Sequence, residues 1–271
     1  MLFRSTEERD PELEKILELI DFDTLRIIFE DYAVRSGCSK EGMNFISRDR
    51  IKPANMGEGV SGRYNSLTNI IILSPEKMRE LFPNNEPLLT VLAVLAHEET
   101  HAVIKNQITA DIQITRNGNN EKRKINTLDG INGYRKNDNF RSFNEGMVEK
   151  LSREVRDRYV ATKPDLLKIS DPKKTEVYNF EVDIVNALIK RISKEVGVSE
   201  QTVWQGFIRG LFEGENLQDP ELLEAFNAMF DKEFIEKLSR VESDKDCVAI
   251  INTIGTEKIL KFFNIYIRFK K

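Results

Sequence analysis

Residues 87–105 read PLLTVLAVLAHEETHAVIK, and the rest of the chain is interpreted around this stretch. Pro87 suits the first turn of a helix, and Asn84 or Asn85 is expected to cap that helix. The apolar residues that follow recur at helical spacing and mark a wide apolar face: Leu88, Val91, Leu92, Leu95 and Val103. We therefore expect a central helix from Pro87 to about Lys105, and it contains both histidines of the chain.

The pattern His97-Glu98-Glu99-Thr100-His101 within this helix is typical of a metal site. Residues i and i+4 share one helical face, about 5–6 Å apart at Cβ, so two imidazoles can reach one zinc ion. Glu98 points about 100° around the helix from His97. It can therefore stand beside Zn²⁺ and take a proton from water as the catalytic base. Glu99 points away from the metal side, and we expect it to be exposed.

A third protein ligand is expected, because hydrolytic zinc sites use three and keep one position open. The chain has no further histidine, so a carboxylate is required. Residues 144–149 read NEGMVE and open a second predicted helix that runs to about Tyr159. Glu145 can bind the metal from a facing helix, and Glu149 can hydrogen-bond a ligand histidine and fix its tautomer.

Each of these carboxylates has an alternative interpretation. Glu145 can instead be a helix-start carboxylate that interacts favourably with the helix dipole. Glu149 can lie on a solvated helix face. If Glu145 is not the third ligand, Glu149 or Glu181 is the next candidate.

The two segments together resemble the gluzincin group of metallopeptidases, which includes the thermolysin-like enzymes and the large aminopeptidases. The resemblance covers residues 55–160 and implies a zincin-like fold with zinc held by His97, His101 and Glu145. It implies that Glu98 is the general base and that Glu149 contacts a metal ligand rather than the metal itself. It also implies that residues 62–73 supply the strand that lies antiparallel to bound substrate. We expect a zinc metallopeptidase, an endopeptidase, acting on a peptide or protein.

The chain also departs from the gluzincin pattern. Between His101 and Glu145 lie 43 residues, far more than in familiar gluzincins, and an inserted hairpin would account for the excess. The Gly-x-Met-Glu-Asn exopeptidase motif of the aminopeptidases is absent from the sequence. The residues that follow the His97–His101 motif in metzincins are also absent, because residues 102–107 contain neither glycine nor a third histidine.

Tyr178 is a further candidate catalytic residue, because enzymes similar to the gluzincins often use a tyrosine or histidine to stabilise the oxyanion. It precedes a strong predicted helix. A packing role is the alternative interpretation for this tyrosine.

The remaining patterns predict an α+β fold in two parts. Residues 1–162 are expected to form a zincin-like catalytic domain with a small mixed sheet, the active-site helix and an inserted hairpin at about 107–142. Residues 163–271 are expected to form an all-α domain. The other expected elements are helices in 11–36, a strand at 70–73 that forms half of a hairpin, and helices at 75–82, 175–195, 199–212, 220–230, 232–241 and 256–269.

Residues 192–203 resemble a helix–turn–helix, which makes a DNA-binding regulator one alternative function. Gly197 is equally a normal helix terminator and Ser199 a normal N-cap. The following helix offers Arg209 as its single basic group among large apolar residues, whereas a groove-reading helix needs several donors. A buried helical hairpin is the preferred interpretation.

Net charge, apolar stretches and cysteine spacing argue against several other classes of function. The net charge of −4 and the pI near 5.6 argue against nucleic-acid binding. The longest strongly apolar stretch, residues 91–96, is far too short to span a bilayer, and the N-terminus lacks the features of a secretion signal. Cys38 and Cys247 are too far apart to form a metal-type pair, so a cytoplasmic setting is expected. A non-catalytic or regulatory zincin-fold module remains the main alternative to an enzyme.

Overall fold

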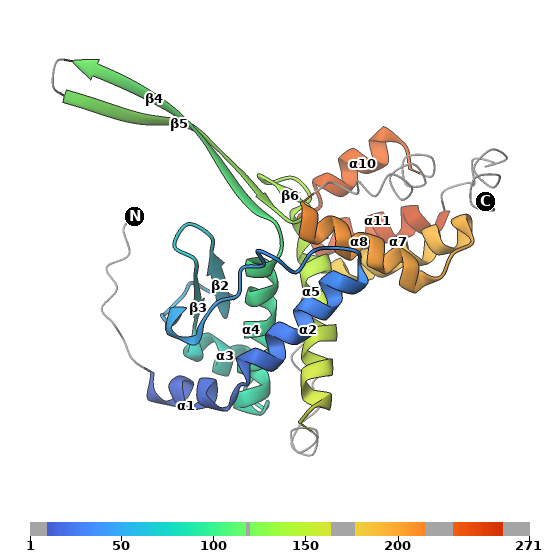
Figure 1. Cartoon of the computed structure of the whole chain (residues 1–271). Coiled ribbons are helices and arrows are strands. Elements are labelled where there is room, and N and C mark those ends of the chain that lie inside the picture. The colour runs from blue at the N-terminus through green and yellow to red at the C-terminus, as the bar shows by residue number, and fades with distance from the viewer. Residues whose placement is uncertain (1–9, 118–119, 164–176, 215–229, 257–271) are drawn as a thin grey trace. The chain divides into compact units, whose positions relative to one another are not determined.

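The computed structural model describes residues 10–117, 120–163, 177–214 and 230–256, and for 108–130 the backbone alone (Figure 1). The described chain is α+β, as predicted, and it forms two compact units. The first comprises Met1–Ile104 and Met147–Asn179, and the second comprises Lys105–Gly146 and Phe180–Lys271. The sequence interpretation placed one boundary near residue 162. The observed division differs because the hairpin segment and the start of α5 group with the C-terminal helices.

The first unit consists of a three-stranded sheet and the helices packed against it. β3 is the central strand, antiparallel to β2 and parallel to β1, so the predicted hairpin of the 70–73 strand is confirmed. The two helices expected in 11–36 and the short helix after Pro75 are also present. In chain order the elements are α1 (Pro11–Leu19), α2 (Phe22–Arg35), η1 (Arg48–Arg50), β1 (Ile51–Pro53), β2 (Gly62–Asn65), β3 (Ile70–Leu73), α3 (Pro75–Leu81), α4 (Pro87–Val103) and α5 (Arg141–Ala161), of which the residues up to Gly146 belong to the second unit.

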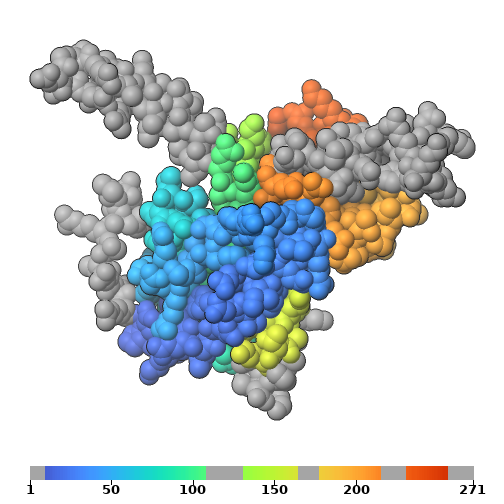
Figure 2. Space-filling view, in the orientation of Figure 1, coloured from blue at the N-terminus to red at the C-terminus, as the bar shows by residue number. Residues whose placement is uncertain are grey.

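α4 is the core helix of the first unit. It packs against α1, α3, β2 and β3, and 13 of its 17 residues are buried. In Figure 2 the visible surface of this unit is formed largely by the blue and cyan residues that precede α4. Pro87 occupies the first turn as predicted, but the capping prediction was wrong. Glu86 is the N-cap and accepts a hydrogen bond from the Leu89 amide at 2.8 Å. It stands directly before the proline, where its negative charge also complements the helix dipole.

The second unit combines a long two-stranded ribbon with helices. β4 and β5 pair antiparallel along their whole length, with a register shift between Asp111 and Ile112, so the inserted hairpin expected at 107–142 is confirmed. A helix beginning at Asp244 was not predicted, although Cys247, Ile250, Ile251 and Ile254 recur at helical spacing. The expected helices at 220–230 and 256–269 lie outside the described residues except at their edges. The elements are β4 (Asn106–Asn117), β5 (Asn120–Asn132), β6 (Arg135–Lys136), the start of α5, α7 (Asn179–Val196), α8 (Glu200–Glu213), α10 (Lys232–Ser239) and α11 (Asp244–Thr256).

The link between α7 and α8 is a turn that ends α7, and the helix that follows buries one of its faces. Gly197 has a φ of +76°, and the Ser199 side chain caps α8 by accepting a hydrogen bond from the Thr202 amide. One face of α8 is buried: Val203, Trp204, Phe207, Ile208 and Leu211. These are the side chains that a groove-reading helix would have to expose, so the arrangement agrees with a buried helical hairpin. Among the described helices, none is long and apolar enough to cross a membrane.

Candidate metal centre

The two histidines of α4 lie together on one face of the helix. Their ring centroids are 5.0 Å apart and the ring planes are inclined by 70°. His97 is buried and His101 is half-buried. The i, i+4 spacing thus produces the local geometry that it predicts, because one turn of helix stacks these side chains.

Glu145 completes a three-residue group with the two histidines. One ligand atom from each of His97, His101 and Glu145 lies within 4.8 Å of the others. Glu145 stands in the second turn of α5, because that helix begins at Arg141, earlier than predicted. Two imidazole nitrogens and one carboxylate oxygen form the donor set that catalytic zinc sites use, so the residues present fit a zinc ion.

Glu149 follows Glu145 by one turn of the same continuous helix and contacts the first histidine. Its Oε2 lies 2.9 Å from His97 Nδ1, the contact expected for a carboxylate that orients a metal ligand. The other oxygen accepts a hydrogen bond from Arg153 Nε at 2.8 Å. Burial disfavours ionisation of Glu149, but hydrogen bonding and charge from His97 and Arg153 outweigh it and lower the pKa of this carboxyl. Glu149 is therefore held as a carboxylate, and the solvated-face alternative is wrong for this buried side chain.

Glu98 lies against the edge strand of the sheet. Its Oε2 accepts a hydrogen bond from the backbone amide of Tyr64 at 2.6 Å. Gly62 permits this close approach of β2 to α4, because a Cβ at this position would collide with the Val94 side chain and press on Glu98. The strand therefore holds one oxygen of this carboxylate in a fixed position.

Tyr178 covers the first histidine. Its ring stacks on the His97 ring with centroids 5.4 Å apart and planes inclined by 15°, while 42% of the residue is exposed. Its φ of +52° is uncommon for a non-glycine residue. The preceding residue, Val177, makes two hydrogen bonds at the same site. Its amide donates to Glu149 and its carbonyl accepts from Arg153. The sequence around Tyr178 gives no signal for these contacts, because Val177 is 24 positions from Arg153 and 28 positions from Glu149.

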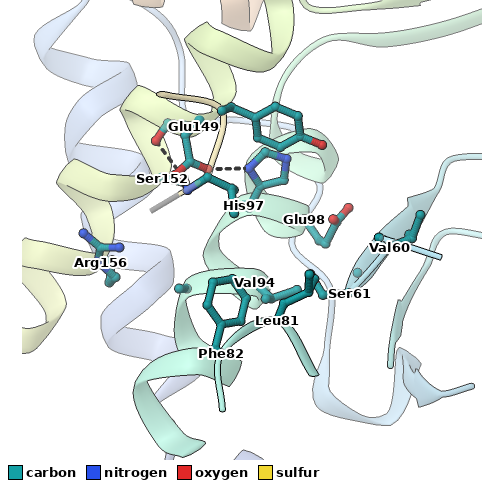
Figure 3. A pocket seen from close by; sticks show the side chains of 15 residues that line it. Val60, Ser61, Leu81, Phe82, Val94, His97, Glu98, Glu149, Ser152 and Arg156 are labelled. Atoms are coloured by element: carbon teal, nitrogen blue, oxygen red, sulfur yellow. Dashed lines mark hydrogen bonds and ion pairs between the residues drawn. The ribbon is translucent and has the colours of Figure 1, made fainter. Parts of the chain in front are cut away.

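A pocket of about 280 Å³ opens beside His97 and Glu98 (Figure 3). All of its lining residues belong to the first unit. They come from residues 59–62, which lead into β2, from the end of α3 and the residue after it, from α4 and α5, and from the two residues before α7. Figure 3 shows the His97–Glu149 contact on one side of this space and Glu98 on the other. The pocket leaves room for a small group next to Glu98.

Two predictions for glutamates near the motif need correction. Glu99 was expected to be exposed, yet it is only 5% exposed, because α4 is buried nearly all round. Its Oε1 accepts a hydrogen bond from the Ile46 amide at 2.8 Å. Burial raises the pKa of Glu99 to about 8, and the hydrogen bond from Ile46 opposes this only in part. Glu181, the reserve third ligand, is not in the three-residue group; its backbone carbonyl lies against Gly146 instead.

The sequence interpretation missed two arginines beside the site. Arg153 follows Glu149 by four residues, and that helical spacing alone indicates an ion pair. Arg156 is buried in the pocket wall, and the sequence around it gives no such signal.

No protein-family model, no curated protein and no solved structure matches this chain.

Proposed function

We propose that this protein is a zinc-dependent peptidase in which His97, His101 and Glu145 bind the metal. The observation that supports this most directly is the convergence of their three ligand atoms within 4.8 Å. The donor set has the composition of a catalytic rather than a closed structural site, because it leaves a fourth position for water. A histidine-bearing helix beneath the edge strand β2, with a glutamate helix beside it, is also consistent with a zincin-like catalytic part resembling the gluzincins.

A zinc ion bound there would act as a Lewis acid and make water acidic enough to lose a proton near neutral pH. Glu98 is the residue that accepts this proton and passes it to the leaving amine. The hydrogen bond from the Tyr64 amide fixes one carboxylate oxygen and so orients the other for proton transfer. Glu149 holds the His97 ring through Nδ1, which directs Nε2 to the metal.

Tyr178 is proposed to donate a hydrogen bond from its hydroxyl group to the oxyanion that forms during peptide hydrolysis. Its ring lies flat on His97 and lines the same pocket as Glu98. Glu98 lines the same pocket as the candidate ligand His97. A base at that place favours this proposal over a regulatory module, because a structural metal site would need no base.

The test is the Glu98→Gln variant, with zinc content and peptide cleavage measured on the same preparation. We expect stoichiometric zinc and a rate lower by on the order of 100-fold or more. Glu99→Gln is the matched control, because it makes the same glutamate-to-glutamine change at the adjacent buried position, which faces Ile46, and it should retain both zinc and cleavage. Unchanged cleavage in Glu98→Gln would reject the catalytic role. Zinc binding without cleavage by the wild type would favour the non-catalytic module.

A further inference from the structure

Arg153 contacts three groups beside the candidate metal centre, all within the first unit. Its Nε donates a hydrogen bond to Glu149 Oε1 at 2.8 Å. Its Nη2 donates to the Val177 carbonyl and also to Asn179 Oδ1, the latter at 2.9 Å. One Nη nitrogen carries two hydrogens, so it can serve both acceptors. The guanidinium therefore joins α5 to residues 177–179.

Tyr178 stands between the two residues that Nη2 of Arg153 contacts. Its φ of +52° lies in a region that residues with a Cβ rarely adopt, and such a conformation persists where the surrounding contacts determine it. Val177 is held twice, because its amide also donates to Glu149 Oε1 at 3.4 Å. Contacts on both sides of Tyr178 thus restrain the backbone from which its ring extends.

The same contacts form a closed loop around His97. Glu149 Oε2 lies 2.9 Å from His97 Nδ1 (Figure 3). The Tyr178 ring stacks on the same imidazole with the centroids 5.4 Å apart. Arg153 links these two neighbours of the histidine, because its planar fork reaches acceptors in different directions. A lysine ammonium carries all its hydrogens on one nitrogen and cannot span them in this way.

We propose that Arg153 is a positioning residue that fixes Tyr178 on His97 and so places the tyrosine hydroxyl for oxyanion stabilisation. This inference rests on the proposed peptidase function. Arg153 does not line the pocket, so it acts through the residues that it holds. Loss of its fork should release Tyr178 while the contact between Glu149 and His97 remains.

The Arg153→Lys variant tests this role, because lysine keeps a positive charge beside Glu149 but lacks the fork. With zinc loaded, we expect kcat to fall about tenfold, as for loss of the tyrosine hydroxyl, with KM little changed. Zinc affinity should stay within about threefold of wild type, below the 10- to 100-fold that loss of a ligand-supporting group costs. A wild-type kcat, or a loss of zinc and rate together, would overturn the positioning role.

Two further variants complete the comparison. Arg158→Gln is the matched control, because Arg158 also lies on α5, pairs with Asp31 at 2.7 Å and does not line the pocket. It should keep the wild-type kcat and zinc affinity. Asn179→Ala is a milder test, because it removes one acceptor of Arg153 and leaves the pair with Glu149 in place. It should lower kcat by about threefold and leave zinc affinity unaltered.

A double-mutant cycle shows whether Arg153 acts through Tyr178. It compares kcat of Arg153→Lys, of Tyr178→Phe and of the variant with both substitutions. The double variant should lose about tenfold, no more than either single variant, because each substitution removes the same positioned hydroxyl. A loss near the product of the two, on the order of 100-fold, would show independent effects and overturn the proposal.

Fluorine NMR of fluorotyrosine incorporated at position 178 reports the placement of the ring without turnover. The stacked imidazole should shift this resonance away from that of free fluorotyrosine, and the shift should be lost in Arg153→Lys but kept in Arg158→Gln. A shift that depends on Arg153, in a protein that cleaves nothing, would refute the peptidase function and retain Arg153 as the residue that holds Tyr178. A resonance that does not move in Arg153→Lys, in a protein that cleaves peptides, would refute the positioning role alone.

Discussion

Glu98 and Glu99 are neighbours on α4 and both are buried, yet they face different surroundings. One step along a helix turns a side chain by about 100°, so the two carboxylates reach different surroundings. Glu98 faces the pocket and accepts the Tyr64 amide of the edge strand. Glu99 faces the closed interior, where it accepts the Ile46 amide and where burial raises the pKa of its carboxyl to about 8. The wall that a glutamate faces, rather than its burial, therefore decides whether it can act on a substrate.

The largest effect is expected at the proposed metal site, which shares His97 with the pocket wall, and it is expected for Glu145→Ala. Removing a proposed direct ligand should weaken zinc binding by more than about 100-fold, beyond the 10- to 100-fold that supporting residues contribute. Competition with a chelator of known affinity measures the change. Glu181→Ala is the control and should leave zinc affinity unaltered, because Glu181 is not in the three-residue group. Full zinc affinity in Glu145→Ala would place the third ligand elsewhere.

Glu149→Gln should have the next largest effect. The amide keeps the shape of the side chain but loses the charge that stabilises His97 and pairs with Arg153. Zinc affinity should fall by about 10- to 100-fold, while the folded state is retained. The same chelator competition gives the value, and circular dichroism checks the fold. An affinity equal to that of the wild type would show that Glu149 has only a packing role.

The site was predictable from sequence where it depends on helical spacing. His97, His101 and the Glu145–Glu149 pair each lie one turn apart, so their shared faces follow from the geometry of a single helix. The sheet strand at 70–73 was predictable because a β-branched run between turn residues has few alternatives. These features require no knowledge of distant parts of the chain.

The features that sequence did not predict depend on contacts between distant segments. Glu99 is buried because α4 is covered nearly all round by other elements. Its hydrogen-bond partner, the Ile46 amide, is 53 residues away, and nothing near Glu99 in the sequence indicates that partner. Tyr178 reaches His97 across a separation of 81 positions, and its place follows from the attachment of Val177 to Glu149 and Arg153. The division into two units likewise follows from packing of the hairpin base, where the Lys105 amide donates to the Leu211 carbonyl.

The buried carboxyl of Glu99 predicts that the free energy of unfolding depends on pH. The pKa of this carboxyl is raised from 4.5 to about 8 on folding, so the folded state binds the proton more tightly than the unfolded state. The stabilisation is complete below pH 4.5 and is lost as pH rises towards 8. Between pH 5 and pH 8.5, metal-free wild type should lose up to about 4 kcal/mol more unfolding free energy than Glu99→Gln. Urea denaturation at both pH values gives the difference, and parallel profiles would contradict it.

Among the residues that line the pocket, Tyr178→Phe is expected to change the catalytic rate least. The substitution removes only a hydroxyl group and keeps the ring that stacks on His97. The residue is 42% exposed, so water competes with its hydroxyl. The expected fall in kcat is therefore about tenfold, below the roughly 100-fold or more that a buried oxyanion donor contributes, with KM little changed. Tyr178→Ala separates the two roles, because it also removes the stacked ring. If the phenylalanine variant keeps the wild-type kcat and only the alanine variant is impaired, Tyr178 serves to hold His97, and stabilisation of the oxyanion must come from another group.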